Sequence, residues 1–408
     1  MTSGALRRSL ARSLAAWLRA ATPGGVLLAV AFSAPLAFGA DDIVIPPDEV
    51  PVQFDEPQAE AALIETTRFI RADVARADFD VSGEGLAAAV LDTGLRTTHV
   101  DFVGRVPIVR NFTTDDGGDV SKVGDGNGHG TNVAGIIAAG GNHTGIAPKA
   151  SVIPLKVLRS QGGGSFDSIR DALQWVIDNR EQYGITVVNM SLGDSRNLAS
   201  DASLAADAVR KRIATLRGTG VPVVVAAGNA YFQHKAQGMG YPAIARETTS
   251  VGAVYDGPIV GGIKYGSGAQ AYTTKAGQIT PFSQRLHVSK CKACATDIFA
   301  PGAPLTSSGN QTDVGESVQH GTSQAAPVTA GVVLLLQQFH RDRVGSLPSV
   351  DQIEGWLQAG VPVEDRDEKA DNVPHTGLTF VRVDAVAAIE AAQRSIAMQR
   401  LATAQATE

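Results

Sequence analysis

The most reactive position that the sequence suggests is Ser323, which lies in the small-residue turn 320–327, HGTSQAAP, directly before the apolar segment 328–339. This order predicts a serine hydroxyl at a helix N-terminus. Backbone N–H groups and the positive end of the helix dipole stabilise negative charge there, and acyl transfer creates such charge beside the attacking oxygen. Because a lone Gly-Thr-Ser also suits an ordinary N-cap, the assignment depends on other residues.

Two upstream residues could serve this serine. Asp92 follows the short apolar run 86–91, LAAAVL, which predicts a buried parallel strand with a carboxylate at its carboxyl end. His129 follows the glycine-rich loop DGNG and begins a helix of small residues, so another chain can approach its imidazole closely. With Ser323 they supply an orienting carboxylate, a general base and a nucleophile.

The segments that must position these residues alternate between strands and helices. Apolar patterning predicts strands at 151–158, 187–190 and 221–226, and amphipathic helices from near Ser165 and over 199–216. The segment 328–339 is apolar nearly all round, as expected of a central buried helix. The alternation predicts an α/β fold with a doubly wound, mostly parallel central sheet flanked by helices.

The chain resembles the subtilisin-like serine proteases, the subtilases of peptidase family S8, from about Phe79 to about Ile389. Four separate motifs carry the resemblance, in the family's order: VLDTG at 90–94, GHGT at 128–131, VVVAAGN at 223–229 and GTSQAAP at 321–327. The resemblance implies a subtilisin-like fold and a secreted serine endopeptidase, a hydrolase of peptide bonds.

The resemblance also implies a role for each motif residue. His129 takes the proton of Ser323 as its oxygen attacks a peptide carbonyl and returns it to the leaving amine, while Asp92 fixes the imidazole. Asn229 and the backbone N–H of Ser323 hold the oxyanion.

The resemblance places the substrate cleft between two short segments. Ser191, Leu192 and Gly193 pair with the substrate backbone by strand addition, and the other wall of the pocket before the scissile bond comes from Ala226, Ala227 and Gly228. These small residues leave room for large apolar or varied side chains. Asp194 is either a site for a basic substrate side chain or a solvated loop residue.

The N-terminal region predicts export. The apolar stretch 24–39 follows an arginine-bearing start and precedes a small-residue end, so it reads as a secretory signal peptide with cleavage near Gly39 or Ala40. A twin-arginine signal at Arg7 and Arg8 is the alternative. We therefore expect a secreted or periplasmic protein, divided into a signal peptide (1–40), a short N-terminal extension (41–78), the peptidase domain (79–393) and a C-terminal tail (394–408), which is helical or frayed.

Composition agrees with a soluble enzyme. The 408 residues carry a net charge of -6 and show ordinary hydrophobicity, which argues against a nucleic-acid footprint and a membrane anchor. The expected partners are protein or peptide substrates, and the expected oligomeric state is a monomer. The extension 41–78 is too short for a folded inhibitory propeptide, so activation is expected to be unconventional.

Cysteine and metal sites are few. The only cysteines, Cys291 and Cys294, favour a local disulfide in an oxidising compartment, with free thiols or a redox pair as alternatives. The chemistry requires no cofactor. The resemblance implies a weak structural calcium candidate at the Asp297 carboxylate with the backbone carbonyls of Arg246 and Thr248.

Two other functional classes remain open. The chain could be a catalytically inactive secreted binding scaffold, although such a scaffold has no chemical need for the triad and Asn229 together. It could also be a subtilase-type exopeptidase or ligase, although no large added domain is present to block the cleft.

Overall fold

The computed structural model describes residues 42–44 and 63–406. The predicted signal peptide, 1–40, lies outside these residues, and so do its predicted cleavage positions. Within them, no helix is long and apolar enough to cross a membrane.

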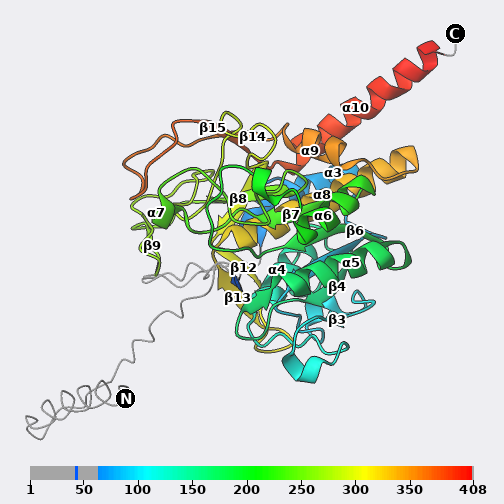
Figure 1. The fold of residues 1–408 in the computed structure, drawn as a ribbon. Coiled ribbons are helices and arrows are strands. Elements are labelled where there is room, and N and C mark those ends of the chain that lie inside the picture. Colours follow the sequence, from blue (N-terminus) through cyan, green and yellow to red (C-terminus); the bar gives the residue numbers. More distant parts are fainter. Residues whose placement is uncertain (1–41, 45–62, 407–408) are drawn as a thin grey trace, which may run out of the picture. The chain divides into compact units, whose positions relative to one another are not determined.

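A nine-stranded sheet forms the centre of the fold (Figure 1). All its neighbouring strands are parallel except the edge pair β14 and β15. In spatial order the strands are β14 (Val361–Glu364), β15 (Thr379–Arg382), β11 (Ile298–Ala303), β8 (Thr249–Tyr255), β7 (Val223–Ala226), β6 (Ile185–Met190), β2 (Ala87–Asp92), β4 (Ser151–Lys156) and β3 (Arg110–Asn111). The predicted fold class is confirmed.

Strand β2 shows how a short apolar sequence is buried on both faces. Ala88 and Val90 belong to one hydrophobic core, while Ala87, Ala89 and Leu91 belong to another. Successive side chains of a strand point to opposite faces, so two helical layers must cover the sheet. Because both faces are covered, the strand is apolar throughout and its carboxylate emerges only at the end.

Helices form the two layers over the sheet. One face packs against α8 (Thr322–Val344), which contacts α4 (His129–Ala138) and α10 (Ala385–Ala406); α9 (Val350–Leu357) lies against α10. The other face is covered by α5 (Phe166–Tyr183) and α6 (Ala208–Gly218), which lie side by side. Helix α8 is buried from Thr322 to His340, as its apolar sequence predicts.

One helix start differs from the prediction. The helix expected over 199–216 begins only at Ala208, because the side chain of Asp207 accepts the N–H of Arg210 and caps the helix there. Residues 199–207 form loops and the short turn Ala202–Leu204. The tail from 394, which the sequence predicts to be helical or frayed, continues α10 as a helix to Ala406.

The N-terminal helices belong to the packed body. Helices α2 (Ile64–Phe69) and α3 (Ala72–Phe79) contact each other, and α3 contacts α8 and α10. Arg71 between them donates to both carboxylate oxygens of Asp384. The region predicted as an extension up to residue 78 therefore contributes to the fold from Leu63 onwards.

Smaller elements complete the described chain. They comprise the antiparallel pairs β1 (Asp42–Val44) with β5 (Gly163–Ser165), β9 (Ile263–Lys264) with β10 (Gln270–Ala271) and β12 (Leu305–Ser308) with β13 (Glu316–Gln319), and the short helix α7 (Tyr231–His234). Cys291 and Cys294 are joined by a disulfide in the loop before β11.

Candidate active site

The carboxyl end of β2 and the first turn of α4 bring Asp92 and His129 together. Oδ1 of Asp92, at the end of β2, lies 2.8 Å from Nδ1 of His129, the first residue of α4. Both side chains are buried, and the N–H of Thr93 donates to the same carboxylate oxygen at 2.7 Å. A carboxylate on Nδ1 fixes the tautomer that leaves Nε2 as the base.

Asp125 organises the loop before the histidine, a role that the sequence did not reveal. One of its carboxylate oxygens accepts from the Thr93 hydroxyl and from the N–H groups of Asn127 and Gly128. The other accepts from the N–H and the hydroxyl of Thr131, at 2.8 and 2.7 Å. The carboxylate therefore ties the first turn of α4 to the residue that follows Asp92. The spacing DGNG suits such a side-chain turn and was the available signal.

Ser323 lies in the first turn of α8, next to the end of β6. Its hydroxyl donates to the backbone oxygen of Ser191 at 3.3 Å, and the Ser191 hydroxyl donates to the backbone oxygen of Ser323 at 2.6 Å. Nε2 of Gln324 lies 3.5 Å from Oδ1 of Asn132, which is one turn beyond His129. The opening turns of α4 and α8, which carry His129 and Ser323, are therefore neighbours.

Asn229 follows β7 and presents one unused donor. Its Oδ1 accepts from the N–H and the hydroxyl of Thr322, at 2.9 and 2.8 Å, which fixes the orientation of the amide. Its Nδ2 is buried and has no hydrogen bond within the part of the chain that the structure describes. A buried donor without a partner costs about 1 to 3 kcal/mol, so its retention beside Ser323 fits a group reserved for a charge that forms during reaction.

A glycine leaves the space in front of this amide open. A Cβ at Gly321 would lie 2.9 Å from Nδ2 of Asn229 and 3.0 Å from Oε1 of Gln324. Any larger residue at Gly321 would therefore push against the Nδ2 donor of Asn229.

The two predicted cleft walls flank Ser323. Ser191 contacts it directly, and Ala226 ends β7, with Gly228 held by a bond from its N–H to the Thr322 hydroxyl. The side chains of Leu192 and Ala227 lie in the hydrophobic core, so these residues can present only their backbone to a peptide. The structure places Gly193 beside them, where it faces the carbonyl of Tyr241.

Asp194 is not a solvated loop residue. Its side chain is buried and accepts from the N–H of Tyr241 at 3.0 Å and from the guanidinium of Arg196 at 2.6 Å. Because Arg196 already neutralises this carboxylate, a basic substrate side chain has no unpaired partner here.

Comparison with known proteins agrees with this arrangement. The model of the subtilase family, Peptidase S8, matches residues 83–361. The chain belongs to the subtilase family. Its relatives are named serine proteases, and this subtilase is accordingly a serine-type peptidase.

Three relatives illustrate the range of the match. The major intracellular serine protease of Bacillus subtilis (strain 168) is 31% identical over 267 residues, which cover 64% of this chain and 71% of the relative. An intracellular serine protease of Paenibacillus polymyxa is 32% identical over 271 residues, or 64% and 70% of the two chains. The subtilisin-like serine protease Pen ch 18 of Penicillium rubens is 33% identical over 262 residues, which cover 62% of this chain and 43% of the relative.

The residues proposed for calcium in this subtilase are engaged with protein groups. The Asp297 carboxylate accepts from the N–H and hydroxyl of Ser250, and burial together with nearby Glu354 raises the pKa of Asp297 to about 7. The Arg246 guanidinium pairs with Asp201, and the Thr248 hydroxyl donates to two backbone carbonyls. These contacts involve the side chains of Arg246 and Thr248, whereas the calcium prediction names their backbone carbonyls, so it stays a prediction. Across residues 42–44 and 63–406, no cluster of three or more His, Cys, Asp or Glu could hold a metal ion.

The buried carboxylate of Asp101, near helix α4, is hydrogen-bonded to His143. Asp101 accepts from the ring and the N–H of His143, at 2.7 and 3.0 Å, and from the Ser308 hydroxyl at 2.6 Å. Burial of Asp101 opposes its ionisation, yet these bonds hold its pKa well below the usual range, and the same carboxylate raises the pKa of His143. The Asp101 carboxylate and the His143 ring are thus a buried hydrogen-bonded pair beside α4.

Proposed function

We propose that this subtilase is an endopeptidase that hydrolyses peptide bonds through Asp92, His129 and Ser323, with Asn229 as a donor to the oxyanion. The observation that carries the proposal is the buried Nδ2 of Asn229, fixed beside Ser323 without a hydrogen bond in the described chain. An inactive binding scaffold gains nothing from an unpaired buried donor, because it would only lose stability.

The reaction assigns one role to each group. His129, oriented through its Nδ1 by Asp92, removes the hydroxyl proton of Ser323 as that oxygen attacks the peptide carbonyl. The negative carbonyl oxygen is then held by Nδ2 of Asn229 and the backbone N–H of Ser323. His129 gives its proton to the leaving amine as the carbon–nitrogen bond breaks, which leaves the acyl group on Ser323. Water then loses a proton to His129 and attacks this acyl carbonyl, and the bond to the Ser323 oxygen breaks as His129 returns the proton to it. No cofactor takes part in these steps, and calcium at Asp297 is at most a structural addition.

We propose that a substrate backbone adds to residues 191–193, as the sequence predicts, and also to a second edge, that of β5. The loop that leads into β5 lies next to the triad at two points. The N–H of Leu158 donates to the Asp92 carbonyl, and Gly126, in the loop before His129, lies so close to Ser160 that a Cβ at Gly126 would clash with it. β5 itself pairs antiparallel with β1, so its edge accepts an extended segment of three residues. Such an edge binds the backbone of a peptide without selecting its side chains, which suits an endopeptidase.

The location is also a proposal. We infer secretion or export to the periplasm from the apolar segment 24–39 and its arginine-bearing start. Two bacterial relatives are named intracellular proteases, so the location must be measured on this chain. N-terminal sequencing of protein recovered outside the cytoplasm should begin near Gly39 or Ala40, and full-length protein confined to the cytoplasm would contradict export.

The activity is tested with an internally quenched peptide that is blocked at both ends. The wild-type protein should cleave it at internal bonds, and Ser323→Ala should not, although both proteins give the same circular dichroism spectrum. An exopeptidase would leave the blocked peptide intact and degrade only a free-ended one, a ligase would join peptides, and an inactive scaffold would bind without cleavage.

A further inference from the structure

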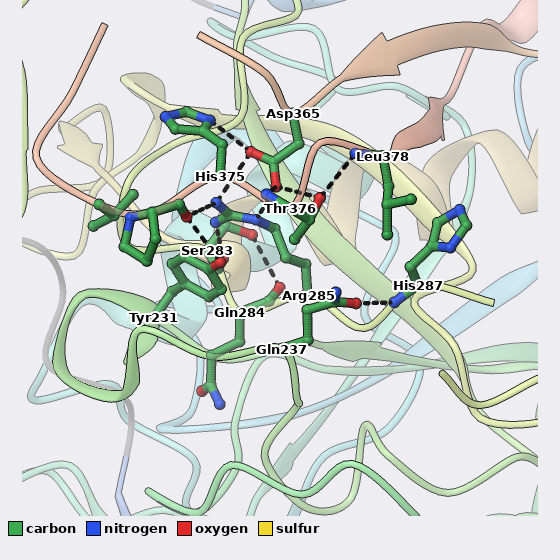
Figure 2. A network of polar contacts seen from close by, with 12 residues as sticks. Tyr231, Gln237, Ser283, Gln284, Arg285, His287, Asp365, His375, Thr376 and Leu378 are labelled. Atoms are coloured by element: carbon green, nitrogen blue, oxygen red, sulfur yellow. Dashed lines mark hydrogen bonds and ion pairs between the residues drawn. The ribbon is translucent and has the colours of Figure 1, made fainter. Parts of the chain in front are cut away.

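A buried arginine lies near the oxyanion donor and is not used by the mechanism. Arg285 is 1% exposed, and its guanidinium donates to both oxygens of Asp365, at 2.9 and 3.1 Å (Figure 2). It also donates to the Ser283 carbonyl at 2.9 Å, and its central carbon lies 3.5 Å from the centre of the Tyr231 ring. Burial of an unpaired charge is strongly unfavourable, so the buried guanidinium of Arg285 depends on its pairing with Asp365.

The partner of Arg285 belongs to the loop 365–378. Asp365 also accepts from the ring of His375 at 2.8 Å and from the N–H and hydroxyl of Thr376, at 2.9 and 2.7 Å. The Pro374 carbonyl accepts from the Tyr231 hydroxyl at 2.9 Å. Figure 2 shows the guanidinium between this loop and the Tyr231 ring. The loop lies beyond residue 361, where the match to the subtilase family model ends.

The segment anchored by Arg285 holds both sides of Asn229. The N–H of Gln284 donates to the carbonyl of Gly228 at 2.8 Å, and the N–H of Tyr231 donates to the carbonyl of Phe282 at 3.0 Å. The residue before Asn229 and the second residue after it are thus both bonded to 282–284.

The space around Gly228 reinforces the contact. A Cβ at Gly228, where φ is 113°, would lie 2.0 Å from Oε1 of Gln284. The amide of Gln284 donates in turn to Asn197 at 2.7 Å. A shift of the segment 282–285 toward Gly228 would therefore press on Gly228 and on its neighbour Asn229.

We propose that Arg285 is a positioning residue for Asn229: through Ser283, Gln284 and Tyr231 it fixes the backbone from which the Asn229 amide reaches the oxyanion. The inference rests on the proposed function, since it needs Asn229 to act in the transition state. It adds a residue 56 positions along the chain from Asn229, and the loop that holds it, to the machinery of this peptidase.

The test is a double-mutant cycle of Arg285→Lys and Asn229→Ala, measured as kcat and KM on the quenched peptide. Lysine keeps the positive charge but cannot bond both Asp365 oxygens and the Ser283 carbonyl as a planar fork does. Asn229→Ala should lower kcat about a hundred- to a thousandfold. Arg285→Lys should lower kcat about ten- to a hundredfold in the wild-type background, with KM unchanged, because a displacement of about 1 Å has that effect. In the Asn229→Ala background it should change kcat less than about twofold.

A matched control separates positioning from general loss of stability. Arg210 is also a buried arginine, bonded to Asp201 and Glu247, and Arg210→Lys should leave kcat unchanged at a comparable loss of thermal stability. If Arg285→Lys does not fold, His375→Gln weakens the same network more gently and takes its place in the cycle.

The outcomes are distinguishable. Equal losses of kcat from Arg285→Lys with and without Asn229 would overturn the positioning role and leave the proposed function intact. A wild-type kcat in Asn229→Ala would overturn the oxyanion assignment itself.

Discussion

Replacement of Asp125 by asparagine should lower kcat, although we assign the Asp125 side chain no contact with the substrate. The carboxylate accepts five hydrogen bonds, three on one oxygen and two on the other. The amide can accept on one side only. If it keeps the bonds from Thr93, Asn127 and Gly128, its NH₂ group faces the N–H of Thr131, which then loses its acceptor.

The expected magnitude follows from that single loss. The Thr131 hydroxyl can turn and accept from the new amide, but the N–H of Thr131 cannot. A hydrogen bond to a charged group contributes about 1.5 to 3 kcal/mol, so the free energy of unfolding should fall by about 2 kcal/mol. Because the first turn of α4 carries His129, kcat should fall about tenfold or more, with KM unchanged.

Steady-state kinetics and denaturant unfolding of Asp125→Asn check both numbers. Asp119→Asn is the matched control, since the Asp119 carboxylate closes a similar turn on Ser121 in an exposed loop, and its kcat should equal that of the wild type. A variant at Asp125 with wild-type kcat and wild-type unfolding would refute the claim that this carboxylate positions the histidine.

Three further predictions follow from other contacts. Hydrogen bonds from the His375 ring to Asp365 and Asp371 raise the pKa of His375 to about 9, above its ordinary value of about 6.5. The stabilisation of the folded state by the protonated ring is therefore complete below pH 6.5 and is lost as the pH rises through 9. The free energy of unfolding should therefore decrease by up to about 3 kcal/mol over this window, and a profile for His375→Gln with the same slope would contradict the assignment. Reduction of the Cys291–Cys294 bond, which closes a very small loop, should cost little stability and leave activity intact; a large loss would mean that this loop supports the cleft. A chain that starts at Leu63 lacks β1, so the edge of β5 is free and kcat/KM should exceed that of a chain starting at Gly39; equal values would show that β1 does not compete with substrate.

The sequence predicted the elements whose signals are local. The apolar run before Asp92 predicted β2, and Ser165 was a correct start for α5, where its hydroxyl accepts the N–H of Ser168. The start expected at 199 for this helix was wrong, because alanine content alone does not locate a helix start, which the Asp207 cap sets at Ala208. Local patterns thus identified the strands and helices better than they located the ends of the helices.

The contacts that shape the site were less predictable because they join distant residues. Arg285 and Asp365 are 80 positions apart, and nothing in either local sequence announces the pair. Asp194 looked solvated because it lies in a polar loop, yet Arg196 and Tyr241 enclose it. By contrast, the motif residues could be located because each occupies the end of an element that the apolar pattern predicts.

The central claim, that Ser323 is the nucleophile activated by His129, is tested most directly by covalent labelling. A fluorophosphonate should form one adduct per wild-type chain, and peptide mass spectrometry should locate it on Ser323. Ser323→Ala should show no adduct, and His129→Ala should label far more slowly because the hydroxyl has lost its base. Labelling of Ser323→Ala at the wild-type level, or an adduct on another residue, would contradict the account.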